Sequence, residues 1–149
     1  MRNDDQKKIL ILGGTKHMID VVETAKRMGM SPIVVDNIIG SPAKRFADKS
    51  FNTSIANIEG LAEIVRNEGV AGVFTTFEDI NTWNAVALCK KMRLPFFAAE
   101  DQLAFTSNID RFTEICQCFN IPVIREEKLT EAFEDTAIAS WEFPVTQAG

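Results

Sequence analysis

The chain has 149 residues, 46% of them hydrophobic and 25% charged, and it carries a formal net charge of -5. This size predicts one ordinary domain, and the near-average composition excludes collagen-like, mucin-like and disordered proteins. The acidic balance argues against a nucleic-acid partner, which would require a clustered positive field. No apolar run approaches the roughly 18 residues that cross a bilayer, and the N-terminus lacks a signal-peptide layout. We therefore expect a cytoplasmic protein with no nucleic-acid and no membrane partner.

The cysteine and histidine contents agree with that compartment. The three cysteines are an odd number, so they cannot all pair within one chain. Cys116 and Cys118 lie two positions apart in a predicted helix and therefore point to different faces. The single histidine, His17, excludes most zinc sites and most histidine-dependent nucleophiles. We expect three free thiols and no metal site.

Strand and helix patterns alternate along the first hundred residues. Short apolar runs predict buried strands at 7–12, 32–36 and 70–76, and weaker runs predict short strands at 49–53 and 95–98. Apolar residues at helical spacing predict helices at 18–28 and 58–68, each followed by a glycine, and another helix that begins near residue 80. This order predicts a Rossmann-like, doubly wound parallel sheet of the α/β class, with a right-handed first crossover.

The pattern changes after about residue 103. Helices are predicted at 109–119 and 132–139, and Phe143-Pro144-Val145 has the composition of a strand that begins just before residue 149. A strand at that place has no partner unless more protein follows. We therefore expect a complete α/β domain at 1–105 and the cut-short opening of a second domain at 106–149.

Gly13, Gly14 and Thr15 directly follow the first predicted strand. Ligands bind open α/β sheets at the carboxyl ends of the strands, where glycines permit a tight turn and the next helix presents amide donors. The sequence lacks the third glycine of a dinucleotide fingerprint, and it is not a Walker A loop. Two interpretations stay open: a turn that contacts a ligand, or a structural turn in which Thr15 caps the helix.

Acidic residues follow two other predicted strands at the same edge of the sheet. Asp36 ends the second strand about twenty residues beyond the glycines, where a Rossmann domain holds the ribose hydroxyls of its cofactor; the alternative is an acid that caps the next turn. Glu78 and Asp79 follow the fourth strand. A carboxylate there binds an amine or polarises a nucleophile, although helix capping is favoured for Asp79. We interpret His17 as an exposed imidazole.

Taken in order, these segments resemble the N-terminal region of ATP-grasp enzymes such as carbamoyl-phosphate synthase, biotin carboxylase and phosphoribosylamine–glycine ligase. The resemblance spans about residues 7–145, and the order and spacing of its motifs are more specific than any one motif. The segments that carry it are the first strand with its glycine turn, Val34-Val35-Asp36, Ser41-Pro42-Ala43 with Ala47-Asp48-Lys49, Gly72-Val73-Phe74-Thr75 with Glu78-Asp79, Leu94-Pro95, Asn108-Ile109-Asp110-Arg111-Phe112, and Asn120-Ile121-Pro122-Val123.

The resemblance implies an enzyme that phosphorylates a carboxylate with ATP and Mg²⁺, after which an amine or another nucleophile displaces the phosphate from the acylphosphate. In such enzymes the N-terminal domain lines the substrate side of the cleft. This implies substrate contacts for Gly13, Gly14, Thr15 and Glu78, and the position of Asp36 makes it a further candidate for the substrate site.

Departures from the family pattern limit what the chain is expected to do alone. Ile109 stands where the family often has a lysine near the nucleotide phosphates, and Arg111, two residues on, is the candidate replacement for nucleotide binding. The glycine-rich phosphate loop and the Mg²⁺-binding residues of the family would lie beyond residue 149. We therefore expect neither tight binding of ATP or Mg²⁺ nor ligase activity from this chain alone. Its expected partners are a small carboxylate or amine substrate and the remainder of the ATP-grasp domain.

Two alternatives stay open from the sequence. One is a small Rossmann-like module that binds a nucleotide or dinucleotide at the glycine turn and Asp36. The other is a non-catalytic interaction subunit that forms a homodimer through an exposed, Phe-rich surface. The substrate is not named by the sequence, because carbamate, amino-acid and ribosylamine acceptors all fit a glycine turn with one or two carboxylates.

Overall fold

A computed structural model describes residues 6–76 and 79–123 of the chain. The chain divides into two compact units, Met1–Ser107 and Asn108–Gly149. The first unit contains, in chain order, β1 (Lys8–Leu12), α1 (Met18–Arg27), β2 (Ser31–Val35), the 3-10 helix η1 (Pro42–Arg45), β3 (Lys49–Phe51), α2 (Ile58–Glu68), β4 (Val70–Phe74), α3 (Asp79–Met92) and α4 (Glu100–Thr106). In the second unit, α5 spans Ile109–Cys118.

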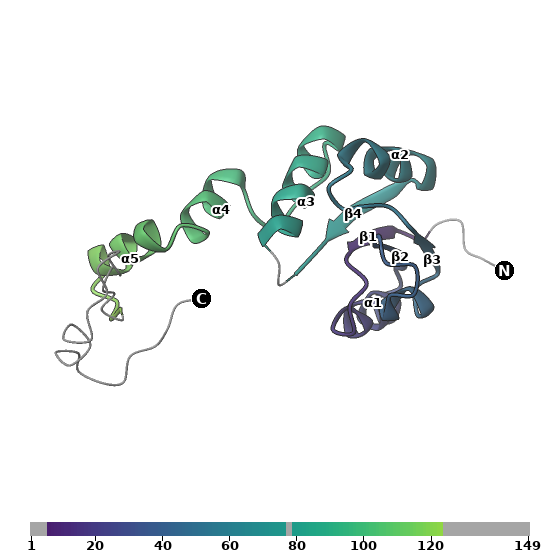
Figure 1. Ribbon diagram of the computed structural model, residues 1–149, viewed down its shortest axis with the longest axis horizontal. Coiled ribbons are helices and arrows are strands. Elements are labelled where there is room, and N and C mark those ends of the chain that lie inside the picture. The colour runs from purple at the N-terminus through teal and green to yellow at the C-terminus, as the bar shows by residue number, and fades with distance from the viewer. Residues whose placement is uncertain (1–5, 77–78, 124–149) are drawn as a thin grey trace, which may run out of the picture. The chain divides into compact units, whose positions relative to one another are not determined.

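The four strands of the first unit form one parallel sheet in the order β3-β2-β1-β4. Helix α1 lies on one face of this sheet, and α2 and α3 lie on the other, as Figure 1 shows. The chain leaves β1 through α1 and enters β4 from α2, so the direction of winding reverses between β1 and β4. The predicted doubly wound α/β sheet of Rossmann type is confirmed.

Burial on both faces explains why the strands have continuous apolar sequences. In β1, Leu10 and Leu12 belong to the hydrophobic cluster that includes residues of α2 and α3, whereas Ile11 belongs to the cluster that includes residues of α1. The same alternation occurs in β2, where Val34 faces the α1 side and its neighbours in sequence face the other. Successive strand residues point to opposite faces, and here both faces are covered.

The ends of α1 and α2 differ in how they are capped. Helix α2 begins at an N-cap, Asn57, whose Oδ1 accepts a hydrogen bond from the Gly60 amide at 3.0 Å, and it ends at Gly69 in the left-handed conformation with φ of 65°. Helix α1 begins differently, because His17 occupies the N-cap position and no side chain caps the helix. The interpretation of Thr15 as the cap is wrong: its carbonyl accepts a hydrogen bond from the Met18 amide at 3.0 Å.

The predicted fifth strand at 95–98 is also wrong, because residues 94–99 are irregular in the described structure. Pro95 has no N–H to give to a ladder, and the Leu94 amide instead donates to the Cys89 carbonyl at 2.9 Å, which closes the end of α3. The apolar character of the segment has another use, since Phe96 and Leu94 pack against the hydrophobic cluster between the sheet and α3.

The described part of the second unit is α5 with the residues that follow it to 123. Asn108 caps α5 by accepting a hydrogen bond from the Arg111 amide at 2.9 Å, and Cys116 is buried whereas Cys118 is exposed. The helix predicted at 132–139 and the strand predicted at 143–145 lie outside the described residues. Across residues 6–76 and 79–123, no helix is long and apolar enough to cross a membrane.

Candidate functional site

The candidate site lies at the carboxyl ends of β1, β2 and β4. Strand order places β1 beside β4, and the winding reverses between them. In open α/β sheets this reversal leaves a crevice outside the carboxyl ends of the strands, and ligands bind there. The turn after β1 carries Gly13 and Gly14, Asp36 follows β2, and Thr75 and Thr76 follow β4.

Gly13 makes the sharp turn that ends β1. Its φ of +103° is a conformation that L side chains rarely adopt, and its amide donates to the Val35 carbonyl at 2.9 Å. An added Cβ would meet the Asn81 side chain at 4.0 Å, so Asn81 is placed beside the turn. Asn81 is 9% exposed and lies in the first turn of α3. The sequence reasoning missed this residue, because a single Asn in a predicted helix carries no motif.

Gly14 is a site of close approach between two loops. Its amide donates to Asp36 Oδ2 at 2.6 Å, and its carbonyl accepts from the Ala43 amide at 3.0 Å. An added Cβ at Gly14 would lie 2.1 Å from Ser41 Oγ and 2.7 Å from Ser41 Cβ. Only glycine therefore fits here, and both backbone groups of Gly14 already have partners inside the protein.

Asp36 acts as a clamp in this structure. It is 6% exposed, Oδ2 accepts from Gly14, and Oδ1 accepts from the Ile38 amide at 2.7 Å. Hydrogen bonds from amides to a charged carboxylate are among the stronger ones in proteins. Asp36 thus holds the turn after β1 against the loop that follows β2. A ribose hydroxyl would have to share these oxygens with the backbone.

Lys44 bonds the loop after β2 to the residue that follows β3. Its ammonium donates to the carbonyls of Asp36 and Ile38, at 2.7 Å each, and to Asn52 Oδ1 at 2.6 Å. An ammonium has three N–H donors, so this set of acceptors uses all of them. The segment between β2 and η1 is therefore fixed to the residue that follows β3. Sequence reasoning missed Lys44, because its three acceptors come together only in the folded chain.

The residues after β4 are polar and partly buried. Thr75 is fully buried, and its Oγ1 donates to the Leu12 carbonyl at 3.3 Å. Thr76 Oγ1 lies 3.5 Å from Met18 Sδ at the start of α1. These contacts connect the ends of β1 and β4 across the reversal of winding. Two consecutive threonines at the end of an apolar run are the sequence signal that would have identified them.

The three remaining predicted site residues are Thr15, Glu78 and Arg111, and each falls in a different part of the chain. Thr15 is exposed on the turn into α1, together with Lys16 and His17. Glu78 lies outside the described residues. Arg111 is exposed in the first turn of α5. The structure brings together Gly13, Gly14, Thr15 and Asp36.

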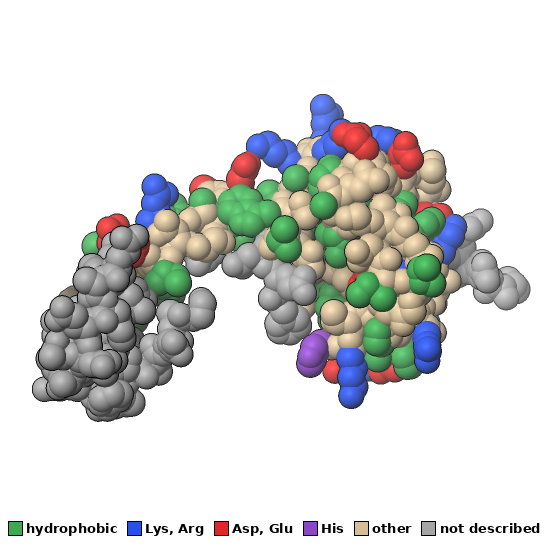
Figure 2. Space-filling view, viewed as in Figure 1, with side chains coloured by type: hydrophobic (Ala, Val, Ile, Leu, Met, Phe, Trp, Pro, Cys, Tyr) green, Lys and Arg blue, Asp and Glu red, His purple; other side chains and the backbone are tan. Residues whose placement is uncertain are grey.

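The charges near this edge do not form a metal site or a single-sign field. Within residues 6–76 and 79–123 there is no group of three or more His, Cys, Asp or Glu side chains that could hold a metal ion. On the face seen in Figure 2, acidic and basic side chains are interspersed over the first unit.

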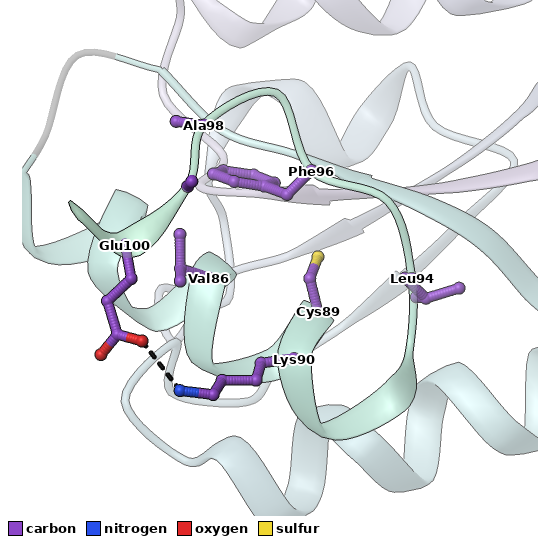
Figure 3. A pocket seen from close by; sticks show the side chains of 8 residues that line it. Val86, Cys89, Lys90, Leu94, Phe96, Ala98 and Glu100 are labelled. Carbon is purple, nitrogen blue, oxygen red and sulfur yellow. Dashed lines mark hydrogen bonds and ion pairs between the residues drawn. The ribbon is translucent and has the colours of Figure 1, made fainter. Parts of the chain in front are cut away.

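A cavity of about 320 Å³ lies elsewhere in the first unit, along the second half of α3. Figure 3 shows it between Val86, Cys89 and Lys90 of α3 and the segment that runs from Leu94 to α4. An ion pair at 2.8 Å between Lys90 and Glu100 lies at its rim. Burial raises the pKa of the Cys89 thiol to about 11, which makes it a poor nucleophile near neutral pH. We place the candidate site at the strand ends, because the reversal of winding between β1 and β4 lies there and this cavity lies away from it.

Comparison with known proteins finds relatives that are longer than this chain. No known family model matches the chain. A formate-dependent phosphoribosylglycinamide formyltransferase from Sulfurisphaera tokodaii is 26% identical, in an alignment that covers 85% of this chain and 38% of the relative. The chain therefore spans less than two-fifths of the length of this curated relative.

Solved structures show the same relationship. An N5-carboxyaminoimidazole ribonucleotide synthetase from Thermotoga maritima superposes with a TM-score of 0.68 and 24% identity, over 93% of this chain and 37% of the synthetase. The biotin carboxylase domain of a single-chain bacterial carboxylase gives a TM-score of 0.69 and 18% identity, over 90% of this chain and 34% of that protein. These are ATP-grasp enzymes, and the chain matches their N-terminal part. The resemblance to the N-terminal domain of ATP-grasp enzymes is confirmed.

Proposed function

We propose that this chain is the substrate-side, N-terminal part of an ATP-dependent carboxylate–amine ligase that works through an acylphosphate. The observation that carries the proposal is the likeness to the phosphoribosylglycinamide formyltransferase over 85% of the chain. The sheet supports it, because the strand ends next to the reversal of winding carry a glycine turn and buried polar groups.

Each predicted site residue takes a specific part in this proposal. Gly13 and Thr15 contact the substrate from the turn after β1, and Glu78 contacts it from the segment after β4. Gly14 shapes the turn, because its amide and carbonyl are already bonded to Asp36 and Ala43. Asp36 contributes by holding the turn in place. The resulting site orients a small carboxylate or amine at the edge of the sheet.

ATP and Mg²⁺ belong to the complete enzyme in this proposal. Bound there, ATP would supply the phosphoryl group that activates the carboxylate. The described residues contain no cluster of metal ligands, so we assign Mg²⁺ to none of them. Arg111 is the proposed contact to the nucleotide phosphates, since an Arg guanidinium suits phosphate oxygens. The further expected partner is the remainder of the ATP-grasp domain.

The alternative of a dinucleotide-binding module is less favoured. A Rossmann domain uses the acid after its second strand to bind ribose hydroxyls, and it uses the amides of the glycine turn to bind the pyrophosphate. Here Asp36 and the Gly14 amide bond to each other at 2.6 Å. Tight binding of NAD or NADP in calorimetry would favour the alternative. A sedimentation series at several concentrations tests the other one, a homodimer.

Two measurements test the proposal. The chain, mixed with ATP, Mg²⁺ and candidate acids or amines, is expected to release no more ADP than a protein-free control. Amide NMR spectra of the same chain, titrated with glycinamide ribonucleotide or glycine, are expected to shift at Gly13, Thr15 and Thr76. Robust ADP release would refute the role as a part of the enzyme. A panel of acids and amines that leaves the turn unshifted would refute the substrate-side assignment.

A further inference from the structure

The loop between β2 and η1 presents apolar side chains beside the candidate site. Ile38 is 63% exposed and Ile39 is 79% exposed, and Ile38 lies two positions after the clamp residue Asp36. Isoleucine is among the residues most often buried in folded proteins. Two adjacent, strongly exposed isoleucines next to a ligand-binding edge therefore call for an explanation.

The polar groups of this loop are turned inward. The Ile38 amide donates to Asp36 Oδ1 at 2.7 Å, and the Ile38 carbonyl accepts from Lys44 Nζ at 2.7 Å. That carbonyl also accepts from the Ser41 amide at 3.3 Å. The amide and the carbonyl of Ile38 are therefore both hydrogen-bonded within the protein, whereas its side chain is exposed.

The loop and the glycine turn are held by one carboxyl group. Asp36 accepts from Gly14 through Oδ2 and from Ile38 through Oδ1, so the two backbones lie on either side of that group. Lys44 bonds the loop to Asn52 as well, and its three donors are used by these internal acceptors. The backbone of Ile38 is thus held next to the turn, and Lys44 has no N–H left to donate to a ligand.

We propose that Ile38 and Ile39 form an apolar flank of the substrate site, and that the substrate carries an aliphatic or aromatic portion that packs against them. This inference rests on the proposed function. A small molecule is the occupant because the flank lies at the carboxyl ends of parallel strands. Small-molecule sites are mostly apolar with a few placed polar groups, whereas a protein interface needs about 20–30 residues on each side.

Glycine and leucine make a matched pair of probes, because they share both charged groups and differ in one isobutyl side chain. Titration of the 149-residue chain, followed by amide NMR, is expected to give about tenfold tighter binding of leucine at Gly13 and Thr15. Leucine alone is expected to shift Ile38 and Ile39 as well. The Ile38→Ser/Ile39→Ser double variant is expected to bind both probes with the affinity that glycine shows.

Met28→Ser is the matched control, since Met28 is 69% exposed at the end of α1 and lies outside the proposed site. The preference for leucine should survive in this variant. Equal binding of glycine and leucine at the turn would refute the flank and leave the proposed function standing. The absence of binding at the turn would overturn the proposed function and the flank together.

Two further outcomes also contradict the flank. Leucine-induced shifts confined to Ile38 and Ile39, with an unchanged Gly13, would show adsorption outside the site. Concentration-dependent broadening of the Ile38 and Ile39 amides without any probe would show that a second copy of the chain covers them.

Discussion

Replacing Gly14 with alanine tests whether close contact between two loops shapes the candidate site. The new Cβ would lie 2.1 Å from Ser41 Oγ, 2.7 Å from Ser41 Cβ and 3.0 Å from Asp36 Oδ2. Rotation of the Ser41 side chain relieves the first contact but not the second. The loop backbone must therefore move away, which weakens the hydrogen bonds that Gly14 makes to Asp36 and Ala43.

We expect Gly14→Ala to lower the free energy of unfolding by about 3 kcal/mol. Overpacking of a tight site costs about 1–3 kcal/mol, and a lost hydrogen bond to a charged group costs about 1.5–3 kcal/mol. The two costs are not added in full, because the loop movement that relieves the overpacking is the movement that weakens the hydrogen bond. Urea denaturation followed by circular dichroism measures the change. Gly40→Ala is the matched control in the same loop, because nothing lies within 4 Å of its added Cβ, and it should change stability by less than about 1 kcal/mol.

A second substitution in the Gly14→Ala background makes the test specific. Ser41→Gly removes both atoms that clash and should recover more stability than Ser41→Ala, which removes the hydroxyl but keeps Cβ. Within residues 6–76 and 79–123, Ser41 Oγ is buried without a hydrogen-bond partner, so its loss leaves no donor or acceptor unpaired. The reasoning is refuted if Gly14→Ala is as stable as the wild type, or if Ser41→Gly adds to its destabilisation.

Three other predictions follow from single features of the first and second units. Asn57→Ala should destabilise the chain by about 1 kcal/mol in urea, because it removes the N-cap bond to Gly60; an unchanged midpoint would contradict the cap. Cys118 should react first with a thiol reagent at pH 8, whereas Cys89 should stay protected until the chain unfolds, because burial raises its pKa to about 11. The folded chain holds the Cys89 proton more tightly than the unfolded chain does. Stability should therefore fall as pH rises from about 9 to 11, and Cys89→Ala should flatten that slope in urea titrations at each pH.

Local sequence signals predicted much of the fold. Continuous apolar runs indicated strands buried on both faces, and glycines after the helical patterns marked where α1 and α2 end. These signals work because side-chain period and backbone conformation depend on near neighbours in the chain. The segment 95–98 shows their limit, since an apolar run also arises where residues such as Phe96 pack over a core without joining the sheet.

The sequence predicted where several candidate residues lie in the sheet, but not which contacts they make. Gly13, Gly14 and Asp36 were identified as residues at one edge, because strand order and spacing put them there. The sequence did not show that Asp36 Oδ2 accepts from the Gly14 amide, because the two residues are 22 positions apart and many acceptors compete for such a donor. The roles of Lys44 and Asn81 were missed for the same reason.

The sequence by itself determined the class of this protein: an acidic chain of alternating strands and helices, with a glycine turn after the first strand and an ordered set of motifs that resembles ATP-grasp enzymes. Only the tertiary structure decided what the polar residues do at the strand ends. Asp36 and Lys44 hold the loop, and Ile38 and Ile39 remain exposed beside the turn. The physical reason is that periodicity is a local property, whereas the partner of a buried charge is set by how distant segments pack together.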